Sequence, residues 1–245
     1  MLIVHCLTAG YGPSTVLQRV SFTAEDASIT AILGAGGAGK TTLANAVCGF
    51  LPVSAGQVIY GGHDITHRAL GDRIHLGISY VPSGLRLFSD VSVLENLRLG
   101  AIGMAPQIFR DHLDFVLSLF PEVKACLNDA AAKLPSSVQR AVMFARGVIN
   151  VPRLLVLDQP SFGLKGEQIH QLFRAISRVN RECGTAVLLM EQKIFQALKL
   201  AETAWLLEKG RIMGERSALE LLADRSMQAD FLRGVWQPLS QERAA

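Results

Sequence analysis

SITAILGAGGAGKTTLANAVCG, residues 28–49, places an apolar run, a glycine-rich loop and a helical pattern in direct succession. The run ITAIL is short and bounded by a glycine, as is typical of a buried strand. After Gly39 the apolar residues recur at helical spacing until Gly49 ends the pattern. The sequence therefore predicts a strand, a glycine-rich turn and a helix in that order.

The loop GAGGAGKT, Gly34 to Thr41, fits the pattern G-x-x-x-x-G-K-[ST] at every fixed position. Glycines let successive backbone N–H groups point into one concavity around a β-phosphate, and the helix start adds its positive dipole end. Lys40 supplies a cation for the β- and γ-oxygens, and the Thr41 hydroxyl suits Mg²⁺. A chance glycine-rich turn is the alternative, and the position between strand and helix argues against it. The predicted nucleotide-binding residues are Gly34, Gly36, Gly37, Ala38, Gly39, Lys40, Thr41 and Thr42.

Strand and helix patterns alternate along the rest of the chain, which is typical of an α/β fold with a mostly parallel sheet. Strands are expected at 2–9, 16–24, 28–33, 57–62, 78–81, 153–157 and 185–190. Residues 94–133 have apolar side chains at helical spacings and predict a helical insertion. Further helices are expected near 137–149, 169–179 and 194–201.

The stretch RLLVLDQ, residues 153–159, delivers an acid and then an amide at the end of an apolar strand. Asp158 ends a strand that can lie beside the strand of the phosphate loop, where a carboxylate holds Mg²⁺. A structural aspartate that caps the next turn is the alternative. Gln159 follows, so the chain supplies no second carboxylate here.

The composition is that of a globular protein, with 49% apolar and 18% charged residues and a net charge of +3. No run of Lys and Arg is dense enough for a nucleic-acid groove. The four cysteines stand far apart, which argues against a zinc site or a disulfide framework. No apolar run approaches the roughly 18 to 20 residues of a membrane span, and the N-terminus lacks a leader pattern. We therefore expect a soluble protein inside the cell.

The chain resembles the ATP-binding subunit of an ABC transporter over nearly its whole length. The stretches that carry the resemblance are GAGGAGKTTLANAVCGFLPVSAGQVIYGG, LGISYVPSGLRLFSDVSVLENLRLGA and KLPSSVQRAVMFARGVINVPRLLVLDQPSFGL. More narrowly, VPSGLRLF, LFPEV, LLMEQKIFQALKLAE, WLLEKGRI and LLADRSMQADFLRG are similar to one ATPase subunit of branched-chain (hydrophobic) amino acid importers. The resemblance implies an α/β P-loop NTPase domain with an N-terminal antiparallel β-subdomain and an inserted helical subdomain.

The resemblance also implies the domain organisation and the two faces of the working site. One nucleotide-binding domain would fill 1–245, with a RecA-like core at about 1–93 and 151–225, a helical subdomain at about 94–150 and a C-terminal helical tail at about 217–236. In this family two subunits sandwich ATP head to tail. Tyr11 stands where the family has an aromatic ring that stacks on adenine, and ordinary packing is the alternative for it.

Four departures from the family pattern concern hydrolysis. Gln159 takes the place of the glutamate that polarises the attacking water, and Ser83 takes that of a Gln or Glu. Gln192 stands where many relatives have the switch histidine, although the branched-chain importer subfamily also tends to have Glu-Gln there. The six histidines (His5, His63, His67, His75, His112 and His170) all precede that strand. LPSSV replaces the signature L-S-G-G-[QE], which acts on the partner's nucleotide; its candidate residues are Pro135, Ser136, Ser137 and Val138. The serine hydroxyls could cap the helix or reach a phosphate.

Together these features predict an importer subunit that binds ATP and Mg²⁺ but hydrolyses ATP poorly. It would lie on the cytoplasmic face of the inner membrane and pair with a second ATPase subunit, as a homodimer or a heterodimer. The helical subdomain would dock on permease subunits, with an extracellular or periplasmic binding protein as an indirect partner. Three alternatives stay open: an ordinary transport ATPase with a displaced base, which could serve amino acid, amide or urea uptake; a soluble ABC regulatory protein; and a pseudoenzyme without ATP binding.

Overall fold

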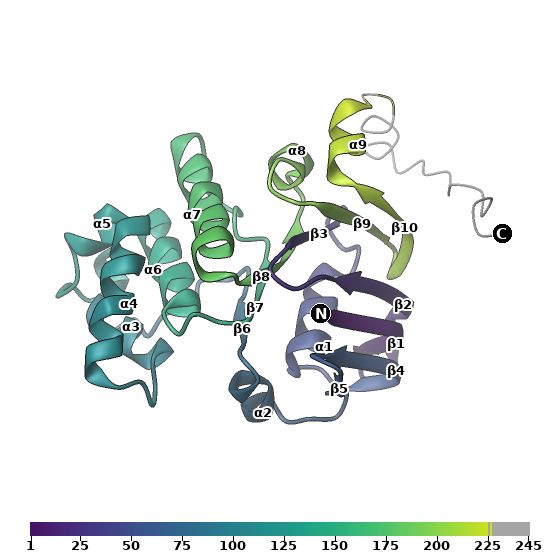
Figure 1. Cartoon of the computed structure of the whole chain (residues 1–245), viewed down its shortest axis with the longest axis horizontal. Helices are drawn as coiled ribbons and strands as arrows, with labels where there is room; N and C mark the ends of the chain where they lie inside the picture. The colour runs from purple at the N-terminus through teal and green to yellow at the C-terminus, as the bar shows by residue number, and fades with distance from the viewer. Residues whose placement is uncertain (225, 227–245) are drawn as a thin grey trace.

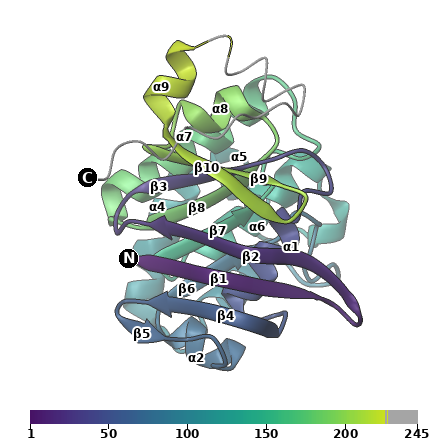
Figure 2. The ribbon, with the colours of Figure 1, turned by 90° about the vertical axis from the view of Figure 1, so that its right-hand side faces the viewer.

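The computed structural model describes residues 1–224 and 226, and it contains two sheets (Figures 1 and 2). The first is antiparallel, in the order β2-β1-β4-β5, and consists of β1 (Leu2–Tyr11), β2 (Ser14–Ala24), β4 (Val53–Tyr60) and β5 (His63–Asp64). The second has the order β10-β9-β3-β8-β7-β6 and is parallel except for β10. Its strands are β3 (Ile29–Leu33), β6 (Ile78–Val81), β7 (Leu154–Asp158), β8 (Ala186–Glu191), β9 (Thr203–Glu208) and β10 (Arg211–Ser217).

The helices form two groups. Beside the sheets lie α1 (Lys40–Cys48), α2 (Leu70–His75), α7 (Glu167–Cys183), α8 (Ile194–Leu198) and α9 (Ala218–Ala223). A separate helical lobe contains α3 (Val93–Gly100), α4 (Pro106–Leu119), α5 (Pro121–Lys124), a 3-10 turn (Ala131–Lys133) and α6 (Ser136–Val148). Figure 1 shows this lobe on one side of β6–β8 and the antiparallel sheet with α1 on the other. No helix in the described ranges is long and apolar enough to cross a membrane.

The central strands are buried on both faces, so their alternate side chains enter two different cores. On β7, Leu154 and Val156 pack in the cluster that holds α1 and the antiparallel sheet. Leu155 and Leu157 face the cluster that holds α6, α7 and the helical lobe. The strand is therefore fixed from both sides, and its end can hold Asp158 in one place.

The structure confirms the predicted α/β class, with its antiparallel β-subdomain and inserted helical lobe. It also confirms the predicted strands and the helices at 40–48, 136–148, 167–183 and 194–198. The placement of Asp158's strand beside the loop's strand was wrong, because β8 lies between β3 and β7. Helix α2 and the hairpin β9–β10 were not predicted. Of the expected tail at 217–236, α9 lies within it, while residues 225 and 227–236 lie outside the described residues.

Candidate functional site: the phosphate loop and an amide pair

The loop between β3 and α1 is open on the side where a phosphate would lie. A Cβ built on Gly36 or Gly37 meets no atom within 4 Å, whereas one on Gly34 would lie 2.4 Å from the carbonyl oxygen of Leu207. Gly34 is therefore needed for the close approach of β9, and Gly37 for its positive φ of 78°. The exposed backbone of Ala35 to Gly37 leads directly into α1. This concavity at a helix start fits an anionic ligand.

Lys40 begins α1 and turns back over the loop. Its Nζ donates to the carbonyl oxygens of Gly34 at 2.7 Å and Ala35 at 2.9 Å. The side chain is only 3% exposed, and burial lowers the pKa of its ammonium, while the charges of Asp158 and Glu191 act in the opposite direction. The two carbonyl contacts keep this buried cation beside the concavity, where phosphate oxygens would be stronger partners.

Thr41 and Asp158 are in contact although β3, which leads into α1, and β7, which ends at Asp158, are not neighbours in the sheet. Thr41 lies in the first turn of α1, and its Oγ1 donates to Asp158 Oδ2 at 2.8 Å. Asp158 is 0% exposed, and its Oδ1 has no hydrogen-bond partner. Burial raises the pKa of this carboxyl. Among the contacts that lower the pKa, the hydrogen bond from Thr41 has the largest effect and Ser83 the next. Ser83 does not reach hydrogen-bond geometry to Oδ1.

The unpartnered Oδ1 is the observation that fits a cation at this position, because a buried carboxylate oxygen without a donor is costly. A hydroxyl and one carboxylate are the two protein oxygens that Mg²⁺ commonly takes when phosphates and water complete its shell. The described residues contain no group of three or more His, Cys, Asp or Glu that would hold a metal by themselves. Thr41 and Asp158 would therefore hold Mg²⁺ together with the nucleotide.

Gln159 and Gln192 form a hydrogen bond to each other at the ends of two paired strands. The Gln192 Nε2 donates to Gln159 Oε1 at 2.6 Å. The backbone N–H of Gln159 also donates to Met190 O at 2.8 Å, which extends the pairing of β7 with β8. Gln159 has a positive φ of 48°, so its side chain leaves the strand direction at this point. Two neutral amides thus occupy the positions singled out in the sequence for the base and the switch.

Comparison with known proteins identifies the family. The family model described as ABC transporter matches residues 17–162, which include the phosphate loop, Asp158 and Gln159. The chain belongs to the ABC transporter family. The match covers more than half of the chain and includes the ends of β3 and β7, whereas the end of β8 and Gln192 lie beyond it.

Individual relatives agree with this assignment. The chain is 34% identical to the high-affinity branched-chain amino acid transport ATP-binding protein BraG of Pseudomonas aeruginosa, over 96% of this chain and 100% of BraG. It is 32% identical to the probable branched-chain amino acid transport ATP-binding protein LivF of Archaeoglobus fulgidus, over 91% of this chain and 94% of LivF. The solved structure of an ATP-binding subunit of an ABC transporter superposes with a TM-score of 0.82 at 22% identity, covering 96% and 97% of the two chains. This chain is therefore an ABC ATP-binding subunit related to branched-chain amino acid importer ATPases.

The positions of the ABC signature lie in the helical lobe, away from the phosphate loop of the same chain (Figure 1). Pro135 is the N-cap of α6, and no side chain caps this helix. The expectation that Ser136 or Ser137 could cap it was wrong, because the helix begins at Ser136 and places both serines within its first turn. Neither hydroxyl forms a hydrogen bond within the described part of the chain; Ser136 is exposed and Val138 is half-buried.

Ser83 and Tyr11 contact two different helices. Ser83 follows β6, and its carbonyl oxygen accepts from Arg140 Nη1 on α6 at 3.1 Å, which joins this segment to the signature helix. Tyr11 ends β1, with its ring 50% exposed. Its hydroxyl accepts from Asn45 Nδ2 on α1 at 3.3 Å, so the ring stands next to the helix that the phosphate loop begins. The role of Tyr11 toward adenine stays a prediction.

Glu191 is a residue of this ABC site that sequence reasoning missed. It is 1% exposed and ends β8; its Oε1 accepts from the N–H of Ser161 at 2.9 Å, and its Oε2 accepts from those of Gln192 at 2.9 Å and Lys193 at 3.3 Å. Lys193 Nζ donates to the carbonyl oxygens of Ser161 and Leu164. Glu191 thus joins the segment after Gln159 to the segment that carries Gln192. The available signal was an acid at the end of the apolar strand TAVLLM.

We expect Glu191→Ala to lower the free energy of unfolding by about 2 to 4 kcal/mol, because it leaves three backbone N–H groups without their buried acceptor. Glu191→Gln keeps the shape and one acceptor oxygen, so its loss should be smaller. Urea unfolding of the two variants measures both values. Equal stability of Glu191→Ala and the parent chain would contradict this role, and Glu182→Ala on the exposed face of α7 serves as the control.

Proposed function

We propose that this chain is the ATP-binding subunit of an importer for branched-chain or other amino acids, and that it binds MgATP but hydrolyses it slowly. The observation that carries the proposal is the Gln159–Gln192 pair beside an intact phosphate loop. Every fixed position of the loop is present, and Asp158 keeps a free carboxylate oxygen for a cation. ATP, with Mg²⁺, is therefore the proposed ligand.

The slow hydrolysis follows from the chemistry of the amide. A water that attacks the γ-phosphate has to lose a proton, and a neutral amide is a poor proton acceptor without negative charge. Gln159 Oε1 already accepts a hydrogen bond from Gln192, which leaves it less able to orient that water. Removal of a general base typically lowers a rate by about 100- to 10,000-fold. Neither Gln159 nor Gln192 offers a replacement.

An ordinary transport ATPase would need a displaced carboxylate, and Glu191 is the buried acid at this edge of the sheet besides Asp158. Both of its oxygens accept backbone N–H groups, and its side chain is 1% exposed. Both oxygens of this carboxylate already accept hydrogen bonds, and its burial keeps water away from it. The geometry therefore favours slow hydrolysis over a displaced base.

The proposed assembly follows from the two halves of the site. Residues 1–245 would act as one nucleotide-binding domain, with the signature in the helical lobe acting on the nucleotide of a second ATPase subunit. Pro135 has neither the hydroxyl nor the N–H of the usual signature serine, so this half is also weakened. A partner subunit with intact motifs would then carry the turnover. The complex would lie on the cytoplasmic face of the membrane, on permease subunits fed by a binding protein.

Two measurements on the purified chain test the proposal. Calorimetric titration with ATP and Mg²⁺ should show binding, and steady-state turnover by the chain alone should fall well below about 1 s⁻¹. Turnover at or above that value would contradict slow hydrolysis, and an absence of binding would indicate a pseudoenzyme. The chains that co-purify from membranes distinguish the assembly: permease and ATPase subunits support it, and their absence favours a soluble regulator.

A further inference from the structure

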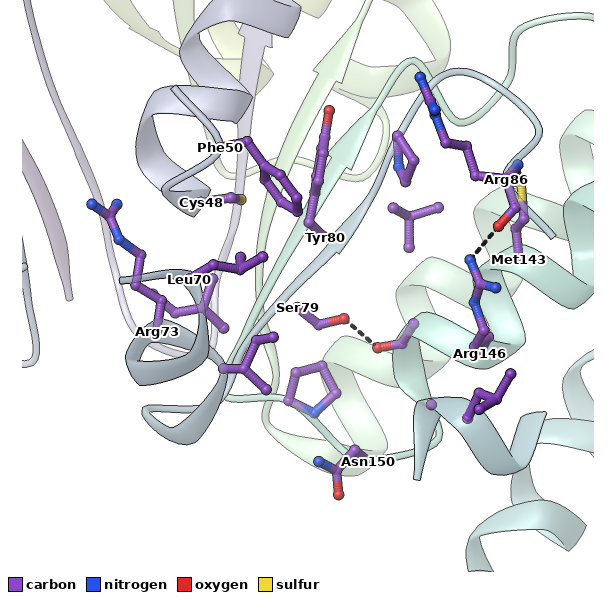
Figure 3. Close-up of a pocket in the computed structure, with 18 of the residues that line it drawn as sticks. Cys48, Phe50, Leu70, Arg73, Ser79, Tyr80, Arg86, Met143, Arg146 and Asn150 are labelled. Carbon is purple, nitrogen blue, oxygen red and sulfur yellow. Dashed lines mark hydrogen bonds between the residues drawn. The ribbon is translucent and has the colours of Figure 1, made fainter. Parts of the chain in front are cut away.

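The segment 150–153, between α6 and β7, forms a wall between two cavities. On one side, Asn150 lines the groove between the helical lobe and the core that Figure 3 shows. On the other side, the next three residues line a second cavity of about 280 Å³. Its other walls are the turns that precede β3 and β8 and the end of β4. This second cavity therefore lies at the opposite edge of the sheet from the phosphate loop and Asp158.

Tyr60 brings an unused hydroxyl to the second cavity. The residue ends β4, is only 7% exposed, and packs in the core cluster that holds α1 and the antiparallel sheet. Its hydroxyl forms no hydrogen bond within residues 1–224 and 226. The hydroxyl oxygen is not fully enclosed, so a ligand in the cavity can reach it. Burial raises the pKa of Tyr60, so the phenol is a neutral hydrogen-bond donor at physiological pH.

Arg153 supplies a free positive charge to the same cavity. Its backbone is fixed at the start of β7, because its N–H donates to Gly77 O at 2.9 Å and its carbonyl oxygen accepts from Ala186 N at 2.9 Å. Its exposed guanidinium forms no ion pair in the part of the chain that the structure describes. Asp26 is the other charged residue of the lining, and its carboxylate is paired with the ammonium of Met1. The unpaired charge at this cavity is therefore positive.

The apolar wall of the cavity has an unusual backbone conformation that neighbouring contacts hold in place. Val151 has a φ of 45°, which is rare for a β-branched residue, and Ala27 has a φ of 52°. Pro152 O accepts from Thr185 Oγ1 at 2.7 Å, and Ala27 O accepts from Asn180 Nδ2 at 2.8 Å. Strained backbone persists where the surrounding structure fixes it, and it occurs preferentially at functional sites. The cavity is therefore preformed, as small-molecule sites usually are.

We propose that this cavity binds a small carboxylate that carries a short apolar group. Arg153 and Tyr60 both line the cavity and would donate to the carboxylate, since a guanidinium matches its two oxygens and a phenol adds one more donor. The apolar group would lie against Ala27, Val151 and Pro152. An inorganic phosphate would leave this apolar wall without a contact, so the lining favours the carboxylate. The inference does not depend on the proposed function, because the cavity is separate from the nucleotide site.

Calorimetric titration of the full chain with three probes tests the chemistry of the ligand. The probes are 4-methylpentanoate, its neutral amide of the same shape, and inorganic phosphate. The carboxylate should bind about tenfold or more tightly than the amide or the phosphate, because it alone offers both a charge and an apolar group. This advantage over the amide should shrink as salt is raised, because the guanidinium is exposed. No binding of the carboxylate, or equal binding of the amide or the phosphate, would overturn the proposal.

Three variants locate the binding site. Arg153→Gln should weaken binding of 4-methylpentanoate by about tenfold or more, whereas Arg110→Gln, the same change on α4, should leave it unchanged. Tyr60→Phe should weaken binding by about threefold to tenfold, through the loss of one donor. Urea unfolding of Tyr60→Phe should match the parent chain, because the hydroxyl has no partner in the described residues. Carboxylate binding that Arg153→Gln leaves unchanged would place the ligand elsewhere and overturn the proposal.

Discussion

Gln159→Glu is expected to raise the rate of ATP hydrolysis by about 100-fold or more, because it places a carboxylate at the position that we propose lies next to the attacking water. The hydrogen bonds around Gln159 can also be formed by a glutamate at this position. Gln192 Nε2 already donates to the oxygen at this position and would donate equally to a carboxylate. The backbone N–H of Gln159 stays bound to Met190 O, so the new side chain starts from the same place. Phosphate release under excess MgATP measures the effect.

The signature half of the composite site has to be controlled in this experiment. The variant Pro135→Ser, Ser136→Gly, Ser137→Gly restores the usual residues, and combining it with Gln159→Glu gives a complete cycle of four proteins. The combined variant should be the fastest, and Gln159→Ala should not rise above the parent chain. If Gln159→Glu changes the rate little in both backgrounds, the chain uses another base and is an ordinary transport ATPase.

Lys40→Ala should lower the affinity for MgATP by about 100-fold, because a charge-assisted contact with the phosphates is typically worth about 1.5 to 3 kcal/mol. The same change removes the two contacts that Lys40 makes with the carbonyl oxygens of Gly34 and Ala35. Calorimetry with a slowly hydrolysed ATP analogue measures the loss.

Three controls separate the charge from the fold of the loop. Lys40→Arg keeps a cation but changes its shape, so it should bind more tightly than Lys40→Ala and more weakly than the parent chain. Urea unfolding should show that Lys40→Ala stays folded. Thr42→Ser, a conservative change within the same turn, should bind ATP almost normally. Unchanged affinity of Lys40→Ala would mean that nucleotide binds elsewhere.

Local patterns were sufficient to predict most of the elements, since period-two and period-3.6 repeats are read from neighbouring residues. The position of β8 between β3 and β7 was not predictable in this way, because strand order depends on pairing between distant segments, and Ile29 of β3 pairs with Val187 of β8, 158 positions later. The chemistry of the two groups assigned Thr41 and Asp158 to the same Mg²⁺, and the structure adds a hydrogen bond between them. It forms across the intervening strand because α1 packs over the face that holds Val156.

Resemblance and residue chemistry singled out Gln159 and Gln192 separately, but only the structure places their amides 2.6 Å apart. Pairing of β7 with β8 brings their ends together, and neither residue carries a local sign of that pairing. The role of Glu191 was not predicted for a similar reason. Its carboxylate accepts hydrogen bonds from three backbone N–H groups, and the sequence alone does not show these contacts. Hairpin β9–β10 was missed because WLLEKGRI was interpreted only as a family match.

Helix α6 connects the signature segment to the part of the helical lobe that contacts β6. Its 13 residues span about 20 Å, with Ser136 at one end and Arg146 and Gly147 at the other. The C-terminal end of α6 packs closely against β6. Ser79 Oγ donates to Gly147 O at 2.6 Å, and a Cβ on Gly147 would lie 2.5 Å from Val81. Because one continuous helix joins the two ends, a displacement of Gly147 relative to β6 would move Ser136 with it, so the position of the signature segment depends on how α6 is held against β6.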